Sequence, residues 1–178
     1  MQAEDKETFK SSKKDDLSRS KLAMSLDYIF GKGTGKRLDY GRLAYEYSRR
    51  TGRLRYVLES ESKKTLFTLR PNGTIAPTVE GARMLVGKKI GKKRPRWVVT
   101  VIDGVSELVS GGKTVFCRHV ADCDKSLRAG EDVVVMNQKG ELLAVGKSVV
   151  SSQVMKQFKR GVAVKVREGS RKNGASVV

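Results

Sequence analysis

The sequence of 178 residues has few of the residues on which most enzyme sites depend. It contains one histidine and two cysteines. The two thiols, Cys117 and Cys123, are too few and too close together for a secreted disulfide framework, which indicates a reducing, cytoplasmic compartment. The histidine, His119, has no neighbouring serine or carboxylate pattern typical of a catalytic triad. We therefore interpret it as a structural or surface residue.

A metal site is also poorly supported. Cys117, His119 and Cys123 could be written as three ligands, but the Cys-x5-Cys spacing matches no zinc signature, and a structural site usually needs four ligands. We interpret Cys117 as a small buried hydrophobic residue. Asp122 and Asp124 lie in predicted turns, where aspartate commonly accepts hydrogen bonds from backbone amides. We expect no metal, no cofactor and no small-molecule substrate.

Long apolar runs are missing as well. No segment approaches the ~18 consecutive apolar residues of a transmembrane helix, and no helical pattern has a broad apolar face opposite lysine and arginine. The first residues mix lysine with acidic residues and have no apolar core, so they resemble neither a signal peptide nor a transit peptide. We predict a disordered tail over residues 1–17 and no contact with membranes.

Acidic residues are scarce relative to basic ones. The chain has 37 Lys and Arg against 19 Asp and Glu, a formal net charge of +18. Such an excess predicts a polyanionic partner, and we favour nucleic acid over a membrane surface. Aromatic residues make up only 6% of the chain, which argues against an extended platform for stacking single-stranded bases. A folded RNA, recognised through its shape and phosphates, fits better.

The first half of the chain predicts a small α+β domain over residues 18–86. Leu22, Leu26 and Ile29 recur at helical spacing, and a glycine ends this helix after Phe30. Alternating patterns predict strands over 43–48, 54–58, 65–69 and 74–76, and Thr78 caps a further short helix. Residues 87–95 combine glycine, proline and five positive charges without a negative one, which is typical of a linker. A solvated hinge and an RNA contact both remain open for this linker.

The last third predicts a small β-barrel over residues 96–169, followed by a flexible tail over 170–178. Short β-branched runs alternate there with glycine-marked turns. One continuous strand is expected over 114–120, and helical turns are expected over 105–110 and 151–158. The fold class is therefore α+β, with the small α+β domain first and the barrel second. Such a chain has no room for a (β/α)8 catalytic barrel, which needs roughly 250 residues.

A glycine-rich loop over residues 30–37 superficially resembles a phosphate-binding loop. It fails as a nucleotide site, because the P-loop spacing needs a glycine where Phe30 stands and a serine or threonine where Arg37 stands. A flexible loop and a contact with an RNA backbone both remain open for this segment.

Basic residues and glycines at turns and strand ends are the candidate RNA contacts. The prediction of an RNA contact rests on the whole group, since each residue alone could be an ordinary solvated charge. The candidates in the last third are Gly111, Gly112, Lys113, Lys147, Lys159, Arg160, Lys165 and Arg167, and those in the glycine-rich loop are Lys32, Lys36 and Arg37.

The order of turns and strands in the last third resembles the PUA domain. The resemblance is carried by Gly112–Phe116, Gly130–Val135 and Gly140–Gly146. In the first half, residues 27–33 and 50–55, and the stretch from Leu69 to Arg83, are similar to the domain that precedes PUA in archaeosine tRNA-guanine transglycosylase.

This resemblance implies a tRNA-binding appendage whose contact surface includes Gly111, Gly112, Lys113 and the last helix and strand. The catalytic barrel of that family, with its aspartates and zinc site, has no counterpart in the sequence. We therefore predict a noncatalytic tRNA-binding protein, an accessory or split subunit that works with a separate tRNA-guanine transglycosylase catalytic subunit. The alternative is a ribosome-associated translation factor that docks on ribosomal RNA through the same domain.

Overall fold

The computed structural model describes residues 4–86 and 97–171, with only the backbone described for residues 4–14. The chain divides into two compact units, Met1–Ala76 and Pro77–Val178. None of the helices in the described ranges has the length and apolar character needed to span a bilayer. The predicted linker, residues 87–95, and the end of the predicted tail, residues 172–178, lie outside the described residues.

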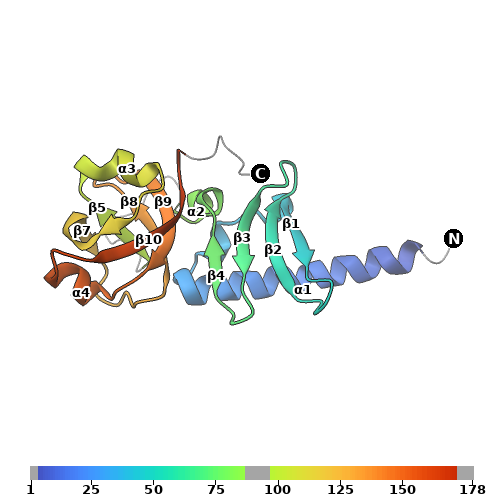
Figure 1. Cartoon of the computed structure of the whole chain (residues 1–178). Helices are drawn as coiled ribbons and strands as arrows, with labels where there is room; N and C mark the ends of the chain where they lie inside the picture. Colours follow the sequence, from blue (N-terminus) through green and yellow to red (C-terminus); the bar gives the residue numbers. More distant parts are fainter. Residues whose placement is uncertain (1–3, 87–96, 172–178) are drawn as a thin grey trace. The chain divides into compact units, whose positions relative to one another are not determined.

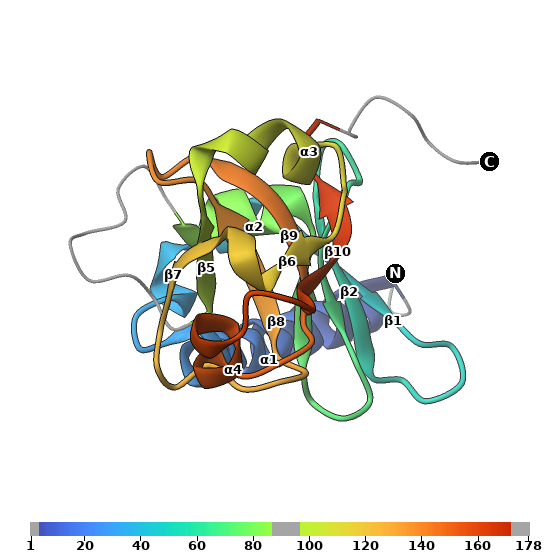
Figure 2. The ribbon, with the colours of Figure 1, turned by 60° about the vertical axis from the view of Figure 1, so that its left-hand side comes forward.

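The first unit combines one long helix with a four-stranded sheet (Figure 1). Helix α1 spans Glu4–Phe30, and the sheet has the order β1-β2-β3-β4. The strands are β1 (Leu43–Tyr47), β2 (Leu54–Glu59), β3 (Thr65–Leu69) and β4 (Ile75–Pro77), and the short 3-10 helices η1 (Gly35–Arg37) and η2 (Tyr40–Arg42) lead from α1 into β1. Strand β2 pairs antiparallel with both β1 and β3. Helix α1 lies along one face of this sheet in both ribbon views (Figures 1 and 2).

The helical periodicity read from the sequence places the right residues in the core. Leu22 and Leu26 are fully buried and Phe30 nearly so, as expected for residues four apart on one face of a helix. The helix begins earlier than expected, because α1 also covers residues 4–17, where the sequence predicted a disordered tail. That stretch contains neither glycine nor proline, and four of its 14 residues are lysine, a good helix former.

The second unit is a six-stranded, nearly closed sheet with the order β6-β10-β9-β8-β5-β7. The strands are β5 (Val98–Val101), β6 (Val115–Phe116), β7 (Val120–Cys123), β8 (Asp132–Met136), β9 (Leu142–Ser148) and β10 (Val162–Gly169). Pairing is antiparallel except between β5 and β8, which run parallel. The α+β fold class predicted from the sequence is confirmed.

Short helices fill the connections of the second unit. They are α2 (Val79–Val86), η3 (Asp103–Val105), α3 (Ser106–Ser110), η4 (Cys117–His119) and α4 (Ser152–Gln157). Helices α3 and α4 lie at opposite ends of the barrel in both views (Figures 1 and 2). The core is built from β-branched and small side chains that include Val99, Val135 and Val164, each fully buried. Because these side chains are buried, the residues that can contact a partner lie on the outer face of the barrel and at its strand ends and turns.

One stretch of the second unit differs from the expected continuous strand over residues 114–120. The chain forms β6, then η4, and then β7, whose residues Asp122 and Cys123 pair with β5. Asp122 was expected in a turn, but here it lies on an edge strand opposite Thr100. Cys117 is 3% exposed within the core cluster, and burial raises the pKa of its thiol, in agreement with its interpretation as a small hydrophobic residue.

Candidate nucleic-acid interface

Strand β10 organises the predicted contact residues of the second unit. Its partner on one side is β6, through the pairs Val162↔Phe116 and Val164↔Val115, and its partner on the other side is β9. The candidates lie in three places along it: Lys159 and Arg160 just before it begins, Lys165 in its middle, and the turn over residues 111–113 beside its last residue, Gly169. The strand thus gathers most of the predicted site on one element.

Lys147 and Lys165 form the centre of this arrangement. They occupy directly opposite positions on β9 and β10, so their side chains project from the same face of the sheet. Both are exposed, and no ion pair is recorded for either among the described residues, although Asp132 on β8, whose carboxylate bonds Arg167, lies opposite Lys147 on its other side. Like charges directly opposite each other destabilise a sheet. A bound anion would relieve that repulsion, which makes this pair a strong candidate for phosphate contact.

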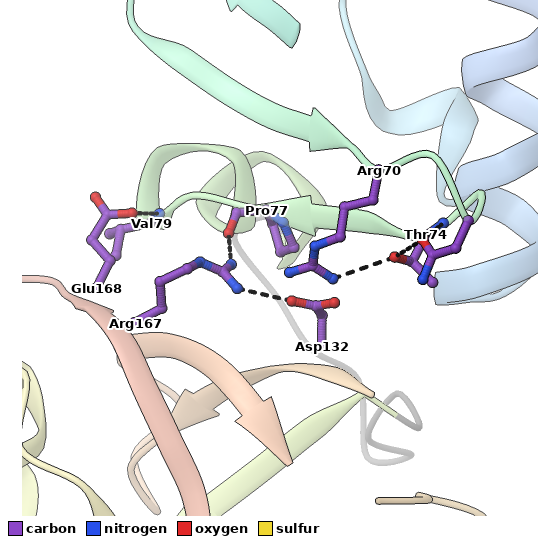
Figure 3. A network of polar contacts seen from close by, with 8 residues as sticks. Arg70, Thr74, Pro77, Val79, Asp132, Arg167 and Glu168 are labelled. Carbon is purple, nitrogen blue, oxygen red and sulfur yellow. Dashed lines mark hydrogen bonds and ion pairs between the residues drawn. The ribbon is translucent and has the colours of Figure 1, made fainter. Parts of the chain in front are cut away.

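Arg167 is two residues beyond Lys165, but its guanidinium is already engaged. Its Nη1 donates to Asp132 Oδ1 at 2.9 Å, and its Nη2 donates to the carbonyl of Pro77 at 2.5 Å (Figure 3). The next residue, Glu168, accepts from the amide of Val79 at 3.0 Å. These bonds attach the start of α2 to the barrel. A contact between Arg167 and RNA stays a prediction, and it would require the guanidinium to share these partners.

The turn over Gly111, Gly112 and Lys113 ends helix α3. The three amides donate to the carbonyls of Glu107, Val109 and Leu108, at 3.0, 2.9 and 3.0 Å. Gly112 has a φ of +90°, a left-handed conformation that favours glycine at the end of a helix. Since the amides are occupied, what this turn offers a ligand is the absence of side chains at 111 and 112 and the exposed ammonium of Lys113.

The end of β10 holds that turn in place. A Cβ at Gly169 would overlap the carbonyl oxygen of Ser110 and lie 2.6 Å from the nitrogen of Gly112. Beyond it, the amide of Arg171 donates to the same Ser110 carbonyl at 3.0 Å, and its guanidinium bonds Glu107 at 3.1 Å. The position of the turn is therefore set by close backbone contact with the last strand.

An exposed aromatic residue beside the start of β10 was missed by the sequence reasoning. Phe116 is 41% exposed, and the guanidinium of Arg118 lies 5.9 Å from its ring centroid. His119 meets the same ring edge-on at 6.1 Å and accepts from Arg118 Nε at 3.0 Å, while burial and the charge of Arg118 lower its pKa. The alternation of buried Val115 and Cys117 with outward Phe116 and Arg118 was the available signal.

The glycine-rich loop of the first unit is closed on a carboxylate. Asp27 Oδ1 accepts from the amide of Gly35 at 2.6 Å and also receives the amide of Gly33, and these bonds lower the pKa of the Asp27 carboxyl. Gly35 itself packs on helix α1, where a Cβ would lie 2.6 Å from the carbonyl oxygen of Ala23. The amides that a phosphate would need are therefore occupied. Lys32, Lys36 and Arg37 are exposed around the loop, and their RNA contact stays a prediction.

The closed loop gives a test by pH. Because the pKa of Asp27 is lower in the folded protein than its ordinary value of 3.8, the Asp27 carboxylate stabilises the fold at pH values above 3.8. This stabilisation is lost as the pH falls through the lower pKa of the folded state. We expect Asp27→Asn to unfold at lower urea than the wild type at pH 7, and the difference to shrink as the pH is lowered toward 3. Circular dichroism would follow both. Asp39→Asn, which removes a carboxylate bonded to a single amide, is the matched control.

Models of two known domain families match this chain, one in each half of the sequence. Residues 97–169 match the model of the PUA domain. The second unit contains a PUA domain. Residues 20–89 match the patch-forming domain C2 of tRNA-guanine transglycosylase. The resemblance read from the sequence is thereby confirmed for both regions.

Relatives of known name share both regions with this chain. It is 34% identical over 155 residues to the tRNA-guanine(15) transglycosylase of Methanothermobacter thermautotrophicus, an alignment that covers 87% of this chain and 23% of that one. Identity is also 34% to the corresponding protein of Methanocaldococcus jannaschii, over 93% of this chain and 25% of the relative. The chain thus spans about a quarter of the length of the curated relatives it matches.

A solved structure matches nearly the whole chain. The hypothetical protein PH0734.1 from Pyrococcus horikoshii OT3 is 29% identical, with a TM-score of 0.67, and the match covers 90% of this chain and 93% of that one. Another chain of similar size therefore has a similar fold. Among the residues whose side chains are described, 15–86 and 97–171, no group of three or more His, Cys, Asp and Glu is arranged to hold a metal ion.

Proposed function

We propose that this chain binds structured tRNA through its PUA domain and serves as the RNA-binding subunit of a tRNA-guanine transglycosylase whose catalytic part is a separate chain. The observation that carries the proposal is the group of basic side chains along β10, centred on the exposed Lys147 and Lys165, in a PUA domain within the region aligned to 34%-identical transglycosylases. The chain corresponds to about a quarter of the length of those relatives, and the proposal gives the base exchange itself to the partner. The cysteine content favours the cytoplasm.

The mechanism follows from elementary electrostatics. Lysine ammonium groups replace the cations condensed on the RNA backbone, and the release of those cations drives binding. Phosphate contacts fix the register of the RNA without reading its sequence. The glycine turn at 111–112 allows a close approach of the RNA backbone, and the partly exposed side chain of Phe116 offers an apolar surface to a terminal base. The chain would thus hold the tRNA while the partner carries out the chemistry.

Salt dependence tests the binding step. With roughly five phosphate contacts to a duplex region, the logarithm of the association constant should fall with a slope of about −4.5 against the logarithm of salt, which is about a 500-fold loss between 50 and 200 mM KCl. Fluorescence anisotropy with a labelled tRNA transcript would measure it. An affinity indifferent to salt would contradict the proposed interface.

The subunit role needs a separate experiment. We expect the tagged chain to copurify with a transglycosylase catalytic subunit from native extract, and to raise that subunit's rate of guanine exchange in tRNA when the two are mixed. Mass spectrometry of tRNA nucleosides should show no exchange by this chain alone. Sedimentation with ribosomes, in place of copurification with a transglycosylase, would favour the translation-factor alternative.

A further inference from the structure

A hollow in the first unit is lined by arginines that none of the preceding roles uses. It opens at one end of the four-stranded sheet, between the loop that joins β1 to β2 and the turn that joins β3 to β4. Both connections lie at the same end of the sheet in the two ribbon views (Figures 1 and 2). The arginines in its lining are Arg49, Arg50, Arg53, Arg55 and Arg70.

The loop that carries Arg49, Arg50 and Arg53 has a defined backbone, and Arg55 follows it at the start of β2. The amide of Ser48 donates to the carbonyl of Arg53 at 2.9 Å, and the amide of Gly52 returns to the carbonyl of Ser48 at 2.8 Å. Gly52 adopts a φ of +63°, which suits a glycine at this tight reversal. Three of the arginines are thus presented from a closed loop and the fourth from strand β2, so less backbone freedom is lost when they bind.

The charges of these arginines are not neutralised within the described structure. Arg49, Arg50, Arg53 and Arg55 are exposed, and no carboxylate partner is recorded for them among the described residues. At the opposite end of the same strands, Arg42 lies 3.6 Å from Glu59 and 3.8 Å from Glu61. Arg42 is therefore paired with carboxylates at one end of the sheet. At the other end, four arginines within seven residues have no carboxylate partner recorded among the described residues.

The lining suits the consecutive phosphates of an RNA backbone better than a single small anion. The hollow has a volume of about 1300 Å³, whereas small-molecule pockets usually measure roughly 300–1,000 Å³. Glu46 is the one carboxylate among the described residues of the lining.

Two guanidinium groups of the lining are held by neighbouring side chains. Arg55 stacks over the ring of Tyr56 with its guanidinium carbon 5.0 Å from the centroid, and Arg70 donates to Thr74 Oγ1 at 3.3 Å (Figure 3). Planar guanidinium groups held in this way match phosphate oxygens with two parallel hydrogen bonds.

We propose that this arginine-lined hollow is a second RNA-binding surface, which holds consecutive backbone phosphates of the same tRNA that the PUA domain contacts. The inference rests on the proposed function and extends it, because it assigns an RNA contact to the first unit and to residues outside the PUA domain. The four arginines at its rim supply sequence-independent affinity, as phosphate contacts do.

Neutralising two arginines of the rim tests the proposal in the full-length chain. We expect Arg49→Gln with Arg53→Gln to weaken binding of a labelled tRNA transcript about 30-fold at 100 mM KCl and to make the salt slope shallower by about 2. The matched control is Arg42→Gln with Lys64→Gln, which removes two positive charges at the opposite end of the same sheet and should change affinity less than 2-fold. Circular dichroism would confirm folding, and Arg50→Gln with Arg55→Gln tests the same rim independently.

A parallel variant separates this inference from the proposed function. Lys147→Gln with Lys165→Gln removes the central charges of the PUA domain. If that variant loses affinity while both rim variants bind tRNA like the wild type, the hollow is not an RNA surface and the proposed function stands. If the control weakens binding as much as the rim variants, the effect is one of net charge and the inference is again overturned. Absence of wild-type binding at 20 mM KCl would overturn both.

Discussion

Replacing Gly169 with alanine is expected to destabilise the PUA domain by about 2–4 kcal/mol, because the new methyl group has no space to occupy. It would overlap the carbonyl oxygen of Ser110 and lie 2.6 Å from the nitrogen of Gly112. Both atoms belong to backbone, so no side chain can rotate away, and either the end of β10 or the turn after α3 must move. Urea unfolding followed by the fluorescence of Trp97 would measure the loss.

The same substitution links stability to RNA binding. Movement of the turn displaces Lys113 and the glycine surface beside it, so we expect tRNA affinity to fall even under conditions where the variant remains folded. Gly104→Ala is the matched control, since a Cβ there meets nothing within 4 Å. If Gly169→Ala unfolds at the same urea concentration as Gly104→Ala, the close contact between β10 and the turn does not set the position of that turn.

Much of the fold could be predicted from the sequence because its elements follow local rules. Leu22 and Leu26 mark the buried face of α1 by their spacing, and Thr78 accepts from the amide of Gly81 at 3.2 Å, as expected for a helix cap. The start of α1 was not predicted, because residues 4–17 lack the apolar periodicity on which the prediction depended. Strand β7 was also missed, since its pairing with β5 is a long-range property.

The candidate site was predicted in composition but not in arrangement. The sequence identifies Lys147 and Lys165 as basic residues near turns or strand ends, whereas their direct opposition depends on the register between β9 and β10. It likewise gives no sign that Asp27 occupies the amides of the glycine-rich loop, because that bond joins residues eight apart across a helix end. The engagement of Arg167 by Asp132, 35 positions away, is equally invisible. Such contacts come from tertiary pairing, which one sequence does not encode in any local pattern.

Reversing the charge at both Lys147 and Lys165 is expected to weaken tRNA binding by at least about 100-fold at physiological salt. Lys147→Glu with Lys165→Glu replaces two cations that would face phosphates with two anions, so attraction is lost and repulsion is added. Anisotropy titrations at several KCl concentrations would measure the affinity and its salt slope.

The single variant Lys165→Glu separates a functional role for these lysines from a structural one. It places a glutamate directly opposite Lys147, which converts a repulsive cross-strand pair into an attractive one worth roughly 0.2–1 kcal/mol. We therefore expect this variant to resist urea as well as the wild type or better while it binds tRNA about 10-fold more weakly. A structural role would move stability and affinity in the same direction. Retained affinity in Lys165→Glu would show that the exposed face of β9 and β10 does not contact RNA, and the group of basic side chains along β10 would then serve only to solvate the domain.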